Sequence, residues 1–432
     1  MKRVLIITYY WPPSGGAGVQ RWLKFVKYLR DFGIEPIVYT PSNPEMPVED
    51  SSLFNDVPAD LEILKQPIWE PYHWYKRWVG VKPQEKINTG FLSESEKPKW
   101  TEKIGVWIRG NFFIPDARCF WIQPSISFLS SYLKDHPVDV IISTGPPHSM
   151  HRIALGIKKK MNIPWIADFR DPWTNIDFYD QLMLTRWADQ KHHKMEREVL
   201  KNADHITTVT HEDRIDFLKK GCLAATQITN GYDDEFVDDQ PLDSHFSLVH
   251  VGSIPPARNH NILWQAIKEL THENTTFEKS FRLELIGKTD ISVRHRIQEL
   301  GIEKYVTLTP YMNHKDAVAA QQKAQVLLLL VNQSINAKSI LTGKFFEYLA
   351  AHRPIVAIGP TDGEMAMILE QCTAGTSINF EELDNLKATL LRYFEEWQSN
   401  GSCQINSQHI EKYSRKNLTG DLSKIIETLA HD

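Results

Sequence analysis

A glycine-rich segment near the start of the chain is the first candidate for ligand binding. The sequence Pro12-Pro13-Ser14-Gly15-Gly16-Ala17-Gly18-Val19 follows an apolar run and precedes a helix-length stretch. Glycines let the backbone approach a ligand closely, and the N-terminus of the following helix attracts negative charge. A phosphate, a sugar or a carboxylate could bind there, although a turn that needs glycine only for its geometry would look the same. A dinucleotide is disfavoured, because the G-x-G-x-x-G spacing is absent and no acidic residue ends the second apolar run at Pro41.

Two polar clusters also follow apolar runs directly. The segment 145–151 carries His148 and His151, and the segment 167–173 carries Asp168, Arg170 and Asp171. Buried charges beyond a strand end are usually paired or used, so the second cluster is either a structural ion network or a set of acceptor contacts. We expect no metal site, because the paired histidines lack a third ligand at a plausible spacing and no clear Asp-x-Asp motif is present.

The elements that must position these residues are visible as short apolar, β-branched runs between longer amphipathic stretches. The expected strands are 4–8, 34–40, 138–144, 165–168 and 205–209 in the first half, then 248–251, 283–286, 306–308, 326–331 and 355–358. Helix-length segments such as 19–32, 149–161 and 184–202 separate them. This alternation predicts an α/β fold with two doubly wound, Rossmann-like domains.

The expected domains are 1–232 and 233–406, followed by a C-terminal helix within 407–432 that packs back on the first domain. The boundary is the turn signal Asn230-Gly231-Tyr232-Asp233. An insertion at about 66–113 interleaves tryptophan and tyrosine with lysine and arginine. It is either a surface that docks on a membrane or a covering subdomain whose aromatic side chains fill a small core or line a cleft.

Composition excludes several classes of protein. The net charge of -5 and the pI near 6.4 give no general attraction to nucleic acid. Four scattered cysteines fit a reduced, cytoplasmic setting, and no apolar stretch reaches the roughly 18 to 20 residues of a membrane span.

The second half contains Thr342-Gly343-Lys344-Phe345-Phe346-Glu347-Tyr348-Leu349-Ala350-Ala351, followed by the Pro-led strand at 354–358. This segment resembles the donor site of GT-B glycosyltransferases, in particular the retaining family 4. The N-terminal glycine-rich loop, the Asn230 crossover and the opening His250-Val251-Gly252-Ser253 match in order. The resemblance implies a GT-B fold, with two Rossmann-like domains facing a central cleft and a C-terminal crossover helix.

The resemblance also implies roles for individual residues. Lys344 would stabilise the leaving diphosphate, Glu347 would bind the ribose hydroxyls, and His148 would contact the donor sugar, with His151 as the second choice. The other residues expected to contact the donor are Gly15, Gly16, Gly18, Gly252, Ser253, Gly343 and Phe346, and the acceptor side would use Asp168, Arg170 and Asp171. A solvated Lys344–Glu347 pair along the helix is the simpler alternative for those two residues.

Two departures from the family pattern concern charge. Ser339 stands where the family often has a first glutamate, and Ser253 and Asn259 stand where it usually has an arginine and a lysine that bind phosphate. Arg258 is the nearest substitute, because a guanidinium can hold phosphate bidentately, although a lone surface arginine would look the same.

The function implied is transfer of a sugar from a nucleoside diphosphate sugar to a hydroxyl, with retention and without a metal or another cofactor. The expected partners are a nucleotide sugar and a saccharide or lipid-linked saccharide, in bacterial cell-surface polysaccharide or lipopolysaccharide synthesis. The expected location is the cytoplasm, with the insertion as a candidate contact to the inner membrane. A non-hydrolysing nucleotide-sugar 2-epimerase and an inactive nucleotide-sugar-binding relative are the alternatives.

Overall fold

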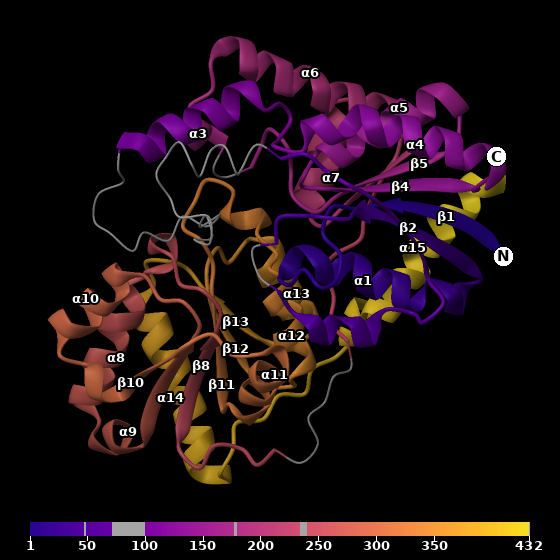
Figure 1. Ribbon diagram of the computed structural model, residues 1–432. Helices are drawn as coiled ribbons and strands as arrows, with labels where there is room; N and C mark the ends of the chain where they lie inside the picture. Colours follow the sequence, from indigo (N-terminus) through magenta and orange to yellow (C-terminus); the bar gives the residue numbers. More distant parts are fainter. Residues whose placement is uncertain (47–48, 71–99, 177–178, 234–239, 432) are drawn as a thin grey trace. The chain divides into compact units, whose positions relative to one another are not determined.

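The computed structural model describes residues 1–46, 49–70, 100–176, 179–233 and 240–431. The chain forms two compact units (Figure 1). The N-terminal unit ends at Thr229 and regains the chain from Arg415 onward, and the C-terminal unit runs from Asn230 to Ser414.

A parallel seven-stranded sheet, in the order β3-β2-β1-β4-β5-β6-β7, forms the centre of the N-terminal unit. Its strands are β1 (Lys2–Ile7), β2 (Ile34–Pro41), β3 (Glu62–Gln66), β4 (Val140–Gly145), β5 (Trp165–Phe169), β6 (His205–Thr208) and β7 (Ala225–Gln227). Buried side chains of β1 alternate between the two faces, so that Val4 and Ile6 enter one core and Leu5 and Ile7 the other. Both faces of the sheet are therefore covered by helices.

One face of this sheet carries α1 (Ala17–Leu29) and α15 (Arg415–His431), which pack against each other. The other face carries α4 (Ile122–Asp135), α5 (Ser149–Met161), α6 (Arg186–Asn202) and α7 (His211–Lys219). Leu418, Leu422 and Ile426 of α15 join the core that α1 forms with the sheet. The last helix of the chain thus completes the apolar core of the N-terminal unit.

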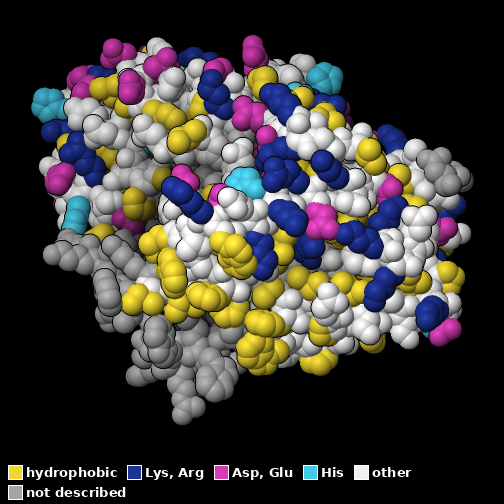
Figure 2. Space-filling view, turned by 90° about the horizontal axis from the view of Figure 1, so that it is seen from above, with side chains coloured by type: hydrophobic (Ala, Val, Ile, Leu, Met, Phe, Trp, Pro, Cys, Tyr) yellow, Lys and Arg dark blue, Asp and Glu magenta, His cyan; other side chains and the backbone are white. Residues whose placement is uncertain are grey.

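Five exposed aromatic side chains define a region that we call the aromatic surface. They are Trp69, Trp107, Phe112, Phe120 and Trp187. Trp107 and Phe112 lie on α3 (Trp100–Phe112), which contacts α6, and Trp69 packs edge-on against Phe120 with ring centroids 4.9 Å apart. Hydrophobic side chains gather along one edge of the face in Figure 2, with Lys and Arg side chains beside them. The aromatic residues of the insertion at 72–78 lie outside the described residues.

The C-terminal unit repeats the plan with a parallel six-stranded sheet in the order β10-β9-β8-β11-β12-β13. Its strands are β8 (Phe246–Val251), β9 (Phe281–Ile286), β10 (Val306–Thr309), β11 (Val326–Leu330), β12 (Ile355–Ile358) and β13 (Gly375–Ile378). Its helices are α8 (Asn261–Glu273), α9 (Thr275–Ser280), α10 (Ile291–Leu300), α11 (His314–Lys323), α12 (Gly343–Ala350), α13 (Glu364–Gln371) and α14 (Leu383–Asn400). In Figure 1, α8, α10 and α14 lie on one side of the sheet, and α11, α12 and α13 on the other.

The predicted strands are confirmed, with ends that differ by a few residues. The sequence interpretation missed β3, β7 and β13. All three are short strands at a sheet edge, and their exposed or partly exposed residues include Glu62 and Lys65. An edge strand tolerates polar side chains, so it lacks the continuous apolar run that identified the central strands.

Both sheets reverse their strand order at one point, between β1 and β4 in the first and between β8 and β11 in the second. Ligands of open α/β sheets bind outside the carboxyl ends of the strands at this point. The glycine-rich loop follows β1 and the loop to His148 follows β4, whereas Gly252 follows β8 and the loop to Lys344 follows β11. Each unit therefore places its candidate residues at its own switch point.

Candidate functional site

Lys344 extends across the carboxyl end of β8. A Cβ atom built on Gly252 would lie 2.6 Å from Lys344 Cε and 3.2 Å from its Nζ. Gly252 has a φ of 143°, which side chains rarely allow, so glycine serves both the turn and the close approach of the lysine. Burial lowers the pKa of Lys344, the charge of Arg258 adds to this, and Glu347 acts in the opposite direction. A bound anion would relieve the cost of holding this ammonium out of water.

Arg258 supplies a second fixed cation to the same switch point. It follows β8 in a short 3-10 helix, Pro256–Arg258. Its Nε donates to Oδ1 of Asn332 at 2.7 Å, and its Nη1 donates to the Ser253 carbonyl at 3.1 Å. Asn332 lies in the loop after β11, so the guanidinium is braced by the loops that follow both β8 and β11. The structure thus places Lys344 beside Gly252 and Arg258 beside Ser253, at the same switch point.

Glu347 lies one turn after Lys344 on α12. Its Oε2 accepts a hydrogen bond from Nε2 of Gln321 at 3.2 Å. Across the part of the chain that the structure describes, no ion pair within 4.0 Å joins Glu347 to Lys344. The solvated pair along the helix is therefore not what the structure contains.

The N-terminus of α12 is open. Thr342 is its N-cap residue but makes no side-chain capping bond, and a Cβ on Gly343 would meet nothing within 4 Å. Among the described residues, the N–H groups of Gly343 and Lys344 have no partner and can bind an anion, whereas that of Phe345 donates to the Thr342 carbonyl at 3.2 Å. Phe346 requires a correction, because it is fully buried and its ring centroid lies 5.4 Å from that of Tyr413. We assign it to the core instead of the donor contacts.

In the N-terminal unit, Arg170 joins two of the predicted loops. Its Nη1 donates to the carbonyl of Gly18 at 2.8 Å and its Nη2 donates to the carbonyl of Pro146. A Cβ on Gly18 would lie 3.0 Å from this Nη1, so a larger residue there would displace the Arg170 side chain slightly. Gly16 is the N-cap residue of α1, with a φ of 91° and no atom within 4 Å of a Cβ built on it. Arg170 thus holds the glycine-rich loop and the His148 loop together at the switch point.

His148 stands at the N-terminus of α5. Its ring stacks on the indole of Trp173, with centroids 4.5 Å apart and planes 2° apart. Burial lowers the pKa of His148 well below its usual value, and the neighbouring His151, His192 and Arg170 lower it further. Its Nδ1 has no hydrogen-bond partner among the described residues. This nitrogen is itself buried and faces Gly145, burial keeps the ring neutral, and the stack on Trp173 holds the ring in one plane.

His151 is a less suitable second choice than the sequence indicated. It is fully buried, its Nδ1 lies 2.8 Å from Ser143 Oγ, and burial lowers its pKa to about 3. It belongs to the core beneath His148.

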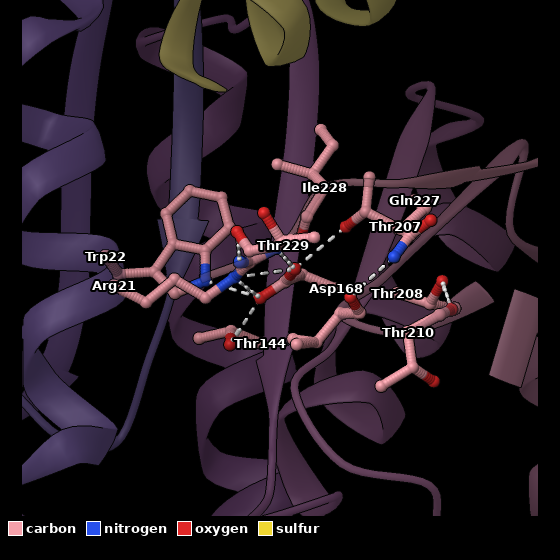
Figure 3. A network of polar contacts seen from close by, with 11 residues as sticks. Arg21, Trp22, Thr144, Asp168, Thr207, Thr208, Thr210, Gln227, Ile228 and Thr229 are labelled. Atoms are coloured by element: carbon pink, nitrogen blue, oxygen red, sulfur yellow. Dashed lines mark hydrogen bonds and ion pairs between the residues drawn. The ribbon is translucent and has the colours of Figure 1, made fainter. Parts of the chain in front are cut away.

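Asp168 also requires a correction (Figure 3). The carboxylate is fully buried, and Arg21, Trp22, Thr144 and Thr207 all donate hydrogen bonds to it. Burial opposes the charged form, but Arg21 and these donors lower the pKa of Asp168 on balance. No surface of this carboxylate is left for an acceptor, so Asp168 belongs to the structural ion network. Asp171 is exposed beside it.

Arg21 extends this network to the end of the N-terminal unit. Its guanidinium donates to the carbonyl oxygens of Ile228 at 2.8 Å and Thr229 at 2.7 Å, where the chain leaves the unit (Figure 3). Sequence reasoning missed Arg21, Gln321 and Asn332. Only Asn332 carried a usable signal, because it follows a strand end; the other two lie within helices and reach their partners through tertiary packing.

The described residues contain neither a metal-binding cluster nor a helix that could cross a membrane. No group of three or more His, Cys, Asp or Glu side chains there could hold a metal ion. No described helix combines the length and the apolar character that crossing a membrane requires.

Comparison with known proteins addresses both the fold and the family. Residues 245–396 match the family model Glycosyl transferases group 1. This match lies within the C-terminal unit and includes Gly252, Arg258, Lys344 and Glu347. A search of curated proteins gave no match.

Solved structures show the fold. TarM of S. aureus, in a mutant complex with fondaparinux, alpha-GlcNAc-glycerol and UDP, aligns with a TM-score of 0.59 and 10% identity, covering 99% of this chain and 100% of that chain. WaaG, a glycosyltransferase involved in lipopolysaccharide biosynthesis, gives 0.55 and 15%, covering 98% and 99%. A putative UDP-N-acetylglucosamine 2-epimerase from Listeria monocytogenes gives 0.55 and 10%, covering 99% and 96%. The chain has the GT-B fold. At these identities the likeness carries no further than the fold, which transferases and an epimerase share.

Proposed function

We propose that this protein is a glycosyltransferase that moves a sugar from a nucleoside diphosphate sugar to a hydroxyl acceptor. The observation that carries the proposal is the convergence of Lys344, Arg258 and the open N-terminus of α12 at the switch point of the C-terminal unit. Two fixed cations beside a helix N-terminus form a site for a multiply charged anion. A diphosphate leaving group has that charge, and the family match over 245–396 covers these residues.

The remaining parts of the donor follow from the neighbours of this anion site. Glu347, one turn along α12, has a carboxylate that accepts hydrogen bonds from both hydroxyls of a ribose. For His148 we propose the role that the resemblance implies, which is contact with the donor sugar.

The proposed reaction is retaining and independent of metal. The bond from the anomeric carbon to the diphosphate breaks, the acceptor oxygen bonds that carbon from the same face, and the acceptor proton passes to the departing phosphate oxygen. The transition state resembles an oxocarbenium ion, as in glycoside hydrolysis. Lys344 and Arg258 stabilise the charge that develops on the diphosphate, which is the part that a metal ion plays in other sites.

The acceptor we propose is a saccharide or lipid-linked saccharide of the bacterial cell surface, reached from the cytoplasm. Support comes from the aromatic surface, where Trp187 is 62% and Phe112 is 68% exposed and Lys191 lies 4.8 Å from the Trp187 ring. Aromatic side chains with cations beside them favour the interface of an anionic membrane. Sedimentation with anionic and neutral vesicles tests this contact, and equal recovery in both supernatants would exclude it.

A thermal-shift panel tests the donor site. UDP, GDP, ADP, TDP and CMP are compared with and without magnesium, because a ligand that binds only the folded state raises Tm. We expect one nucleoside diphosphate to stabilise the protein without magnesium, by about 2.7 kcal/mol at a concentration of about 100 Kd. Stabilisation by none of them would refute the proposal. Product analysis with the matching nucleotide sugar then separates transfer, which releases the nucleoside diphosphate, from epimerisation, which does not.

A further inference from the structure

Gln321 is a buried polar residue in a position where packing alone would call for an apolar one. It lies on α11 and is 1% exposed, and Ala317 and Val318, four and three residues earlier on the same face, are also buried. Burying an amide costs free energy unless its groups are hydrogen-bonded. The bond from its Nε2 to Glu347 Oε2, at 3.2 Å, supplies that partner. The buried amide of Gln321 therefore serves as a hydrogen-bond donor to the Glu347 carboxylate.

Glu347 has a competing partner on its own helix. Lys344 precedes it by three residues, a spacing at which opposite charges on a helix readily pair. Among the described residues these two make no ion pair, since Lys344 reaches across Gly252 and Glu347 is bonded to Gln321. An ion pair between Lys344 and Glu347 would satisfy both charges. The Lys344 ammonium would then no longer be available to the diphosphate of a nucleotide, and the Glu347 carboxylate would no longer be available to its ribose hydroxyls.

We propose that Gln321 is a positioning residue that holds the Glu347 carboxylate away from Lys344. The carboxylate then stays available to the ribose hydroxyls of a nucleotide and the ammonium stays available to its diphosphate. This inference rests on the proposed function and assigns the selectivity of the site for ribonucleotides to a residue that does not touch the ligand. Gln321 acts from a helix that is packed on β8, so its amide is held by the fold and not by the ligand.

The variant Gln321→Met tests the proposal, because methionine keeps the length of the side chain and removes the donor. Isothermal titration measures the affinity of UDP, GDP and ADP, each against its 2′-deoxy counterpart. We expect the wild type to bind one ribonucleotide about tenfold more tightly than its 2′-deoxy counterpart, and the variant about twofold more tightly. The reason is that the hydrogen bond from the ribose hydroxyl to the Glu347 carboxylate is weakened in the variant. The same substitution at Gln322, the next residue on α11, serves as the matched control and should leave the ratio unchanged.

Inorganic pyrophosphate gives a second readout that a merely structural role would not move. In Gln321→Met, Glu347 is free to pair with Lys344, so pyrophosphate affinity should fall about threefold. Adding Glu347→Gln to this variant should restore it, because a neutral amide cannot compete for the ammonium. An unchanged ribose preference in Gln321→Met, or a loss of pyrophosphate binding that Glu347→Gln does not reverse, would overturn the inference.

These outcomes are distinguishable from failure of the proposed function. If wild-type protein binds none of the three nucleoside diphosphates, the donor site itself is wrong, and the role of Gln321 is rejected with it. If the wild type binds one of them without preferring the ribose form, the assignment of Glu347 to ribose fails, and the positioning role fails for that reason alone.

Discussion

Replacing Lys344 by methionine separates two effects of this lysine, its effect on the stability of the ligand-free protein and its effect on the affinity for a nucleoside diphosphate. Methionine retains an apolar stem beside Gly252 and removes the charge. A hydrogen bond to a charged group contributes about 1.5–3 kcal/mol, and each 1.4 kcal/mol is a factor of ten in Kd. We therefore expect Lys344→Met to weaken nucleoside diphosphate binding by about 10- to 150-fold.

The ligand-free variant should change in the opposite direction. The unfolded chain keeps the Lys344 proton up to its ordinary pKa of 10.5, whereas burial gives the folded protein a lower pKa. Below that lowered pKa the folded state carries a charge that it holds unfavourably, so the charge costs stability there, and the cost vanishes above pH 10.5. Lys344→Met removes this cost, so its Tm without ligand should exceed that of the wild type near neutral pH.

The assay combines calorimetric titration with thermal melting across pH. Wild-type affinity should fall as the pH rises through the lowered pKa of Lys344, whereas Lys344→Arg should keep its affinity because a guanidinium stays charged. The matched control is Lys338→Met, at an exposed lysine paired with Asp362. Binding by Lys344→Met within about threefold of the wild type, with unchanged pH dependence, would refute the reasoning.

Two further predictions concern the N-terminal unit. Asp168→Asn should destabilise the protein by about 3–5 kcal/mol near neutral pH, because it leaves Arg21 buried without its anion. Urea unfolding measures the difference in free energy of unfolding between the wild type and the variant. This difference should shrink as the pH falls through the lowered pKa of Asp168, because the wild-type carboxylate then becomes neutral too. An equal difference at all pH values would contradict the prediction. His148→Gln should lower kcat about 100-fold with donor Kd unchanged. Because burial keeps His148 neutral, its removal should not abolish any acidic limb near pH 6.5 in the rate profile, and the loss of such a limb would count against this assignment.

The sequence by itself determined the repeated α/β plan and indicated which loops follow the central strands. Central parallel strands are buried on both faces, so they appear as continuous apolar runs, and the residues that follow them must meet at the carboxyl edge. The resemblance to GT-B donor sites named Gly252 and Lys344, which lie 92 positions apart (344 less 252), and the structure brings them into contact.

Tertiary structure decided what the side chains at that edge do. The sequence offers Asp168 and Phe346 as candidate ligand contacts. Only the tertiary structure shows that the Asp168 carboxylate pairs with Arg21 and that the Phe346 ring packs beside Tyr413. The Gln321 amide was invisible to sequence, since a polar residue within a helix gives no sign of the partner that a neighbouring helix presents. Local pattern fixes where a residue lies along an element, whereas its partner depends on how elements distant in the chain pack together.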